Sequence, residues 1–266
     1  MLASAGVPHR LEPWGEAWTL SVPEEEVGRA REALEAFDAE EHAPVRPSVV
    51  ADRPVPWVLG VGVGLLLIEG FVVTGPATAA SRWFERGAAM AGLMRAEPWR
   101  SVTALLLHVD VAHIAGNALA TAVLLPAVAQ RLGAGAGLLL VLLAGAVGNV
   151  LAAMIHSPGH AAVGASTATF AAIGMLGVLR FCSGSAGEHR RWKSWTVPAA
   201  SLLLLALLGA GRGADVLAHV TGFASGAVFG LVGAVSQQPR GLALQWTFGA
   251  LAAAIVAACW LRAFVW

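Results

Sequence analysis

Two residues that lie far apart in the chain, Ser166 and His219, could together form a reaction centre. Ser166 stands near the head of an apolar run that begins at Gly164, and His219 stands near the start of another. A serine hydroxyl is a weak nucleophile until a base within hydrogen-bond reach takes its proton. We predict that Ser166 is the nucleophile and His219 the general base of an acyl-transfer reaction.

A second pair, His113 and Asn117, could stabilise the anion that this chemistry creates. The two residues are four positions apart and therefore share one face of a helix. Acyl transfer needs hydrogen-bond donors aimed at the oxyanion of a tetrahedral intermediate. Their side-chain N–H groups and the backbone N–H of Ser166 would supply three donors. From the spacing alone, the pair could instead bond to neighbouring helices and hold a bundle together.

The composition indicates what kind of fold must position these residues. Of the 266 residues, 57% are hydrophobic and 13% are charged, whereas a soluble domain carries roughly 25% charged residues. Apolar runs close to the ~20 residues that a spanning helix needs recur along the chain. They predict seven membrane helices, at 57–75, 108–130, 134–155, 164–181, 196–211, 214–235 and 242–264. The predicted fold class is therefore an all-α polytopic membrane protein.

The predicted helices divide the chain into three parts. Residues 1–53 hold much of the charge and are expected to form a small α/β cytoplasmic segment, with a strand at 18–22 and a helix from about Glu24. Residues 54–235 contain six of the predicted helices and all the candidate catalytic residues, and residues 236–266 contain the last predicted transmembrane helix. We expect the first loop, 76–107, to be folded and partly embedded in the membrane, because its tryptophans and arginines suit the interface.

The lysines and arginines set the predicted orientation, since cytoplasmic loops carry the excess of them. They precede the first helix and recur in alternate loops, which makes the N-terminus cytoplasmic and places Ser166 and His219 just inside the extracytoplasmic face. The first loop, 76–107, is an exception, because it carries four arginines on the predicted outer side. No basic segment followed by an apolar core opens the chain, so we expect no cleaved signal peptide. The Ala-, Gly- and Arg-rich composition without tyrosine favours a bacterial plasma membrane. A nucleic-acid partner is not expected, because the net charge of +0 gives no basic surface excess to bind one.

Glycines would let the two catalytic helices approach each other. Gly222, Gly226 and Gly230 form a ridge at four-residue spacing that begins about one turn after His219. Such small residues allow close packing of membrane helices. Gly164, two positions before the serine, gives the backbone freedom at the helix start.

With these elements in place, the chain resembles the rhomboid intramembrane serine proteases over residues 57–235. The motifs that carry the resemblance are Trp99-Arg100, His108-x4-His113-x3-Asn117 in the second helix, Gly148-Asn149, Gly164-x-Ser166 and Ala218-His219-x2-Gly222-x3-Gly226. The resemblance implies a Ser–His dyad without an acid, and an oxyanion hole made by His113, Asn117 and the Ser166 amide. It also implies that His108 shares the polar cavity, that Trp99 and Arg100 brace the first loop, and that a seventh helix follows a six-helix core.

Three features fit this resemblance less directly. Thr167 stands where the family most often has glycine, and its bulk could narrow the cavity without inactivating the site. Asp215 lies one turn before His219, but a place at the helix end favours an N-cap over a third catalytic residue. The spacing of His156 and His160 matches no zinc pattern, so we expect no metal and no cofactor.

Three functions remain open from the sequence. The first is an intramembrane serine endopeptidase that cuts transmembrane segments of other membrane proteins. The second is a rhomboid-like pseudoprotease that binds membrane clients without cutting them, which the presence of both Ser166 and His219 disfavours. The third is a transporter, which the absence of an internal repeat disfavours. The sequence predicts membrane-protein substrates and the lipid bilayer as partners, and gives no prediction of the oligomeric state.

Overall fold

The computed structural model describes residues 2–3, 5–15, 17–41, 55–182, 215–235 and 241–265. The chain separates into two compact units, Met1–Asp52 and Arg53–Trp266.

The N-terminal unit is a β-hairpin followed by a helix. Strands β1 (Arg10–Trp14) and β2 (Ala17–Ser21) pair antiparallel, and a 3-10 turn, η1 (Glu24–Glu26), leads into α1 (Val27–Glu41). Leu2, Val7 and Ala30 form its small core. The sequence predicted the second strand and the helix but missed β1. All five β1 residues are exposed, so this strand has no buried face to produce an alternating pattern.

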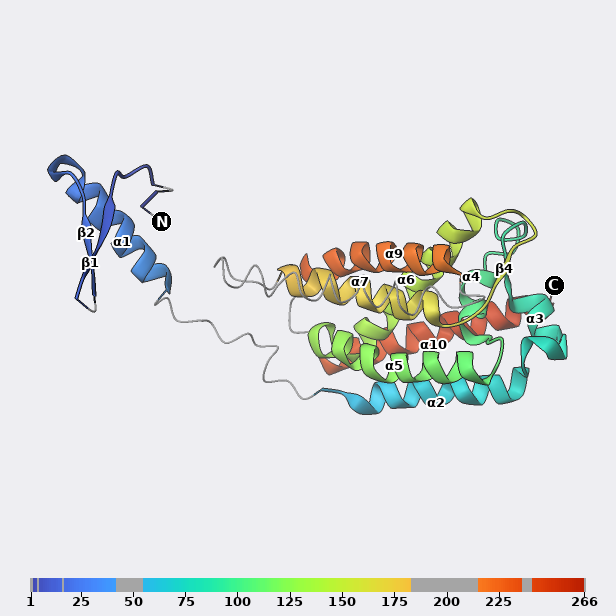
Figure 1. Ribbon diagram of the computed structural model, residues 1–266. Helices are drawn as coiled ribbons and strands as arrows, with labels where there is room; N and C mark the ends of the chain where they lie inside the picture. The colour runs from blue at the N-terminus through green and yellow to red at the C-terminus, as the bar shows by residue number, and fades with distance from the viewer. Residues whose placement is uncertain are drawn as a thin grey trace. The chain divides into compact units, whose positions relative to one another are not determined.

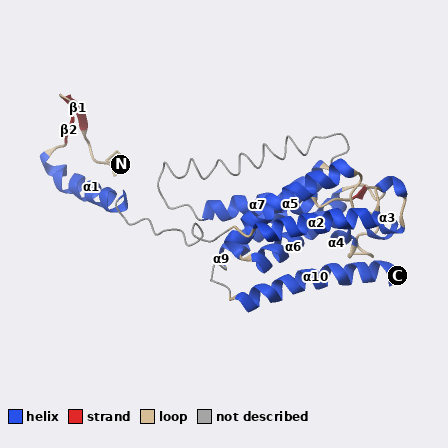
Figure 2. Cartoon of the chain, turned by 90° about the horizontal axis from the view of Figure 1, so that it is seen from below, coloured by secondary structure: helices blue, strands red, loops and turns tan. Residues whose placement is uncertain are grey.

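The second unit is a bundle of apolar helices (Figures 1 and 2). These are α2 (Trp57–Thr74), α5 (Val111–Leu132), α6 (Ala134–Ile155), α7 (Ser166–Cys182), α9 (Val216–Val235) and α10 (Leu242–Val265). Five are long and apolar enough to cross a membrane, and α7, with 17 residues, is shorter. Their bounds agree closely with six of the seven predicted segments. The predicted segment at 196–211 lies outside the described residues.

One predicted boundary is wrong in a way that concerns the site. The second membrane helix was expected from residue 108, which would have put His108 and His113 on one helix, but α5 begins at Val111. The side chain of Asp110 stops it there, because it accepts a hydrogen bond from the His113 N–H at 2.8 Å and caps the helix. His108 therefore belongs to the preceding loop.

The first loop is folded, as predicted. It contains η2 (Ala77–Ala79), α3 (Arg82–Gly87), β3 (Ala89–Met90), α4 (Arg100–Thr103) and η3 (Ala104–Leu106). Strand β3 pairs antiparallel with β4 (Ala161–Ala162), which lies just before Ser166. Arg100 is only 3% exposed and joins three parts of the loop. Its guanidinium donates to the Glu97 carboxylate at 2.6 Å and to the carbonyl oxygens of Glu85 and Ala88 at 3.0 and 2.9 Å.

Helices α7 and α9 run side by side (Figure 1) and pack backbone to backbone. A Cβ atom at Gly230 would lie 2.9 Å from the Met175 carbonyl oxygen, and one at Gly226 would overlap the carbonyl of Ala171. The glycine ridge predicted on α9 is therefore the surface that meets α7. Its close approach sets the distance between the helices that carry His219 and Ser166.

Helix α10 packs along α6 and is joined to it by a polar side chain. The Gln245 Oε1 accepts from the Ala136 N–H at 3.0 Å, and its Nε2 donates to the Leu132 carbonyl at 3.4 Å. One amide thus bonds backbone groups on both sides of the turn between α5 and α6. Near its other end, Trp260 and Phe264 make edge contacts with Trp83 of the first loop, with ring centroids 5.0 and 4.6 Å away.

Candidate active site

Ser166 is the first residue of α7, and the segment before it is held by backbone hydrogen bonds. The Gly164 N–H donates to the Ala104 carbonyl at 2.9 Å, and the Ala165 N–H donates to His108 Nε2 at 3.3 Å. Gly164 has φ +125°, a conformation that an L side chain rarely adopts. These constraints fix the direction in which the chain enters α7 and hence the position of Ser166.

His219 lies in the first turns of α9 and is only 6% exposed. Its ring stacks on Phe170 with centroids 4.4 Å apart and planes at 29°. Phe170 is four residues after Ser166 in α7, so the two share a helix face. The structure thus brings His219 beside the face of α7 that carries Ser166. Among the described residues, no hydrogen bond joins the two side chains, and the buried His219 Nδ1 has no partner.

The Asp215 carboxylate forms its hydrogen bonds with groups other than the His219 ring. Its Oδ1 accepts from the Ala218 N–H at 3.0 Å, which confirms the predicted N-cap of α9. The same carboxylate bonds His156 and His160. Partial burial opposes its ionisation, but the hydrogen bonds from Ala218 and the two histidines outweigh burial and lower the pKa of Asp215.

His113 lies beside the segment that leads to Ser166. A Cβ atom at Gly164 would be 2.7 Å from His113 Nε2, so only glycine leaves room for the ring. His113 Nδ1 accepts a hydrogen bond of 3.4 Å from the Val109 N–H. In the neutral imidazole this leaves the proton on Nε2, the nitrogen nearer Gly164. Asn117 is buried, and its Nδ2 donates to the His113 carbonyl at 2.9 Å within the same helix.

His108 is completely buried beside His113, with the two rings edge to face and centroids 5.3 Å apart. Burial, and then the neighbouring His113, lower the pKa of His108 from 6.5 to about 4. The imidazole is therefore neutral near pH 7. A neutral ring is what the Ala165 N–H requires, because only an unprotonated Nε2 can accept its hydrogen bond.

The other predicted residues lie where the supporting helices meet. The Thr167 methyl group faces Gly148 of α6 and Gly222 of α9, where an added Cβ would lie 2.7 and 3.0 Å from it. Its bulk is therefore taken up between helices. Asn149 donates to the Ser101 carbonyl at 2.9 Å and joins α6 to α4. The Trp99 ring lies beneath the Arg262 guanidinium of α10, 5.1 Å from the ring centroid.

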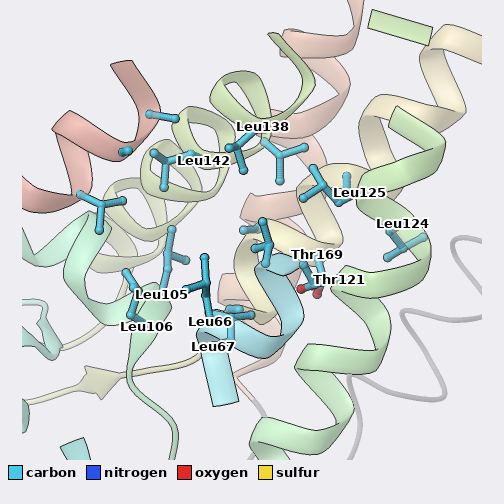
Figure 3. Close-up of a pocket in the computed structure, with 18 of the residues that line it drawn as sticks. Leu66, Leu67, Leu105, Leu106, Thr121, Leu124, Leu125, Leu138, Leu142 and Thr169 are labelled. Carbon is cyan, nitrogen blue, oxygen red and sulfur yellow. The ribbon is translucent and has the colours of Figure 1, made fainter. Parts of the chain in front are cut away.

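An apolar cavity of about 460 Å³ lies against α7, on a face other than the one that carries Ser166 and Phe170 (Figure 3). Helices α2, α5, α6, α7 and α10 and the 3-10 turn η3 line it, mostly with leucines, valines and alanines. Ala168, Thr169 and Ala172 of α7 line it together with Ala165, the residue before that helix, whereas Ser166 and His219 do not. The cavity is therefore separate from the space between the serine and the histidine.

Two relationships were missed by sequence reasoning. Phe170 was not singled out, although its place four residues after Ser166 marks it as the neighbour of any group beside the serine. The pairing of Asp215 with His156 and His160 was also missed. These residues are 55 or more positions apart from Asp215 in the chain, and no local pattern connects them.

Comparison with known proteins shows the family of the chain. Residues 95–236, more than half of the chain, match the rhomboid domain. The chain is also similar to the rhomboid protease GluP of Bacillus subtilis (strain 168), with 38% identity over 84 residues. That similarity covers 32% of this chain and 16% of the relative, so it spans only a small part of the relative's length. The matched domain contains every predicted catalytic and supporting residue. The chain belongs to the rhomboid family.

Proposed function

We propose that the protein is an intramembrane serine endopeptidase that hydrolyses peptide bonds in or near transmembrane segments of other membrane proteins. The observation that carries the proposal is the stacking of His219 on Phe170, 4.4 Å between centroids, one helical turn from Ser166. This contact supports the assignment of His219 as the base for Ser166, the serine that begins α7. Membership in the rhomboid family supports the reaction class.

In the proposed reaction, Ser166 Oγ attacks the scissile carbonyl while His219 takes the hydroxyl proton. His219 then passes that proton to the leaving amine as the C–N bond breaks. Water, deprotonated in turn by His219, hydrolyses the resulting ester and restores the serine. Asp215 takes no part, because its carboxylate is bonded to Ala218, His156 and His160. The centre is thus a dyad without an acid.

The proposed oxyanion hole is formed by His113, Asn117 and the backbone N–H of Ser166. The first N–H groups of a helix have no partner within it, which suits the Ser166 amide for an incoming oxyanion. His113 would donate from Nε2, because its Nδ1 already accepts from Val109. Asn117 uses one side-chain N–H for the His113 carbonyl and has a second to offer.

The finer topology is part of the same proposal. The helix predicted at 196–211, which lies outside the described residues, would complete a six-helix catalytic core, with α10 as the seventh and additional helix. The distribution of basic residues supports a cytoplasmic N-terminus and an active site toward the extracytoplasmic face. The Ala-, Gly- and Arg-rich composition without tyrosine supports a bacterial plasma membrane. In this topology the substrate is a transmembrane helix that unwinds near that face.

The alternative within the family is a pseudoprotease that binds clients without cutting them. A serine-directed fluorophosphonate probe separates the two functions. We expect the full-length protein in detergent to be labelled at Ser166, as located by mass spectrometry, and to cleave a model transmembrane substrate. Ser166→Ala and His219→Ala should lose both signals, whereas the exposed Ser157→Ala should keep both. An unlabelled but folded parent protein would identify the pseudoprotease.

A further inference from the structure

Two histidines and an aspartate form a compact cluster outside the proposed active site. His156 Nε2 lies 3.0 Å from Asp215 Oδ1, and His160 Nε2 lies 2.7 Å from Asp215 Oδ2. The two imidazole rings stack with centroids 3.6 Å apart and planes at 12°. One ring nitrogen of each histidine and a carboxylate oxygen all lie within 4.8 Å of one another. The side chains are 17 to 31% exposed, so the cluster is open to solvent.

The backbone around the cluster holds the two histidines in place. His156 is the C-cap residue directly after α6, and its N–H donates to the Ala152 carbonyl at 3.0 Å. The His160 N–H closes a turn on the Ser157 carbonyl at 2.9 Å, and its carbonyl accepts from the Ala91 N–H at 3.0 Å. The first loop thereby fixes the position of His160. Preorganised ligands bind a metal ion with little loss of conformational freedom.

The chemistry of the three side chains suits one class of ion. Zinc is held by imidazole nitrogen and carboxylate oxygen at about 2.0–2.2 Å, so small movements of the three side chains would let one ion replace the direct hydrogen bonds. Imidazole with carboxylate favours zinc and its neighbours over calcium or magnesium, which prefer oxygen alone. The Ala218 N–H orients the carboxylate, as groups around metal ligands commonly do. We propose that His156, His160 and Asp215 bind one Zn²⁺-class divalent transition-metal ion, with water at the open position.

A metal ion at this site would connect two segments that lie next to the proposed catalytic residues. His160 lies six residues before Ser166, and Asp215 lies four residues before His219. A bound ion would join the loop that leads to the serine to the first turn of the helix that carries the histidine. Since the ion binds the folded chain, it stabilises the contact between this loop and the start of α9 by mass action. The site is independent of the proposed peptidase chemistry, because neither Ser166 nor His219 is a ligand.

The test measures metal binding directly, on full-length Ser166→Ala protein in detergent so that self-cleavage plays no part. After chelation and desalting, Zn²⁺ is titrated against a chromophoric chelator, and we expect one ion per chain. His156→Gln and His160→Gln should each raise the dissociation constant by more than about tenfold. Asp215→Asn should do the same, and because Asn also caps helices, α9 should stay folded.

Two controls distinguish ligand loss from general damage. Asp110→Asn alters the equivalent N-cap of α5, and His9→Ala removes a histidine of the N-terminal unit, so both should bind Zn²⁺ like the parent. With Co²⁺ in place of Zn²⁺, we expect visible d–d absorption that His160→Gln abolishes. A thiolate-to-metal charge-transfer band would assign the ion to Cys182 or Cys259 and overturn the proposal. Absence of stoichiometric Zn²⁺ binding, or equal affinity in the three ligand variants and the parent, would overturn it as well.

Discussion

His108 Nε2 accepts a hydrogen bond from the backbone N–H of Ala165, the residue immediately before Ser166, at 3.3 Å. The acceptor is completely buried, and burial beside His113 lowers its pKa to about 4. Protonation of His108 would replace the acceptor lone pair with a second donor facing the Ala165 N–H. The start of α7 therefore depends on a histidine that stays neutral.

The first prediction concerns the pH dependence of stability. His108 has a pKa near 6.5 when unfolded and about 4 when folded, so the unfolded chain binds more protons between these values. The His108 contribution to the free energy of unfolding is fully present above pH 6.5. It falls by up to about 1.4 kcal/mol per pH unit as the pH drops toward 4. His108→Gln keeps an acceptor but cannot titrate.

Thermal unfolding of the parent and His108→Gln in detergent, from pH 7.5 to 4.5, measures this difference. We expect the melting temperature of the variant to fall less steeply than that of the parent. If the melting temperatures of the two proteins fell in parallel with pH, the hydrogen bond from the Ala165 N–H would not depend on the charge state of His108.

A second prediction follows from the backbone of Gly164. Alanine there must adopt φ +125° and place its Cβ 2.7 Å from His113 Nε2. Backbone strain of this kind costs on the order of 1–3 kcal/mol, and relief would displace either the ring or the serine. We expect Gly164→Ala to lower kcat/KM by more than about tenfold. Gly159→Ala, in the same loop with open space around the added atom, should retain activity within about twofold. If Gly164→Ala were as active as the parent protein, the tight contact between Gly164 and His113 would not control the position of Ser166.

The contact between α7 and α9 gives a third prediction. A methyl group at Gly226 overlaps the Ala171 carbonyl and must push the two helices apart. Overpacking costs typically about 1–3 kcal/mol, and the same movement separates His219 from the Ser166 face. Gly226→Ala should therefore lower both the melting temperature and the rate of cleavage. In Gly62→Ala of α2 the added Cβ meets no described atom within 4 Å, so both quantities should stay near the parent values.

Arg100 gives a fourth prediction, because its planar guanidinium bonds two carbonyls and a carboxylate at once. Lysine keeps the charge but cannot reproduce that fork. We expect Arg100→Lys to lower the free energy of unfolding by at least about 1 kcal/mol per lost hydrogen bond. The exposed Arg95→Lys is the matched control in the same loop and should unfold like the parent. Limited proteolysis within residues 85–100 should accelerate only in the Arg100 variant.

Sequence reasoning succeeded where a local pattern reports directly on structure. Unbroken apolar runs located α6 and α10 to within a residue, because lipid-facing and buried residues alike must be apolar. The four-residue glycine ridge predicted the face of α9 that meets α7, because only small residues permit backbone contact.

The rest could not be predicted, for two physical reasons. His108 was placed in a helix because the apolar run around it is continuous, and only the Asp110 cap shows that α5 starts later. The cluster of His156, His160 and Asp215 depends on the pairing of two distant segments. Their separation in the chain carries no information about their distance in space, so the sequence indicated no metal site.

Gln245 has a consequence for how the molecule is assembled. Its amide bonds the Ala136 N–H and the Leu132 carbonyl, yet α10 is synthesised after every other described helix. While the ribosome is still making α9, those two backbone groups have no side chain from α10 to bond. The turn between α5 and α6 is therefore completed only when α10 enters the bilayer. The two hydrogen bonds that join α10 to this turn can therefore form only after the helices that carry Ser166 and His219 have been synthesised.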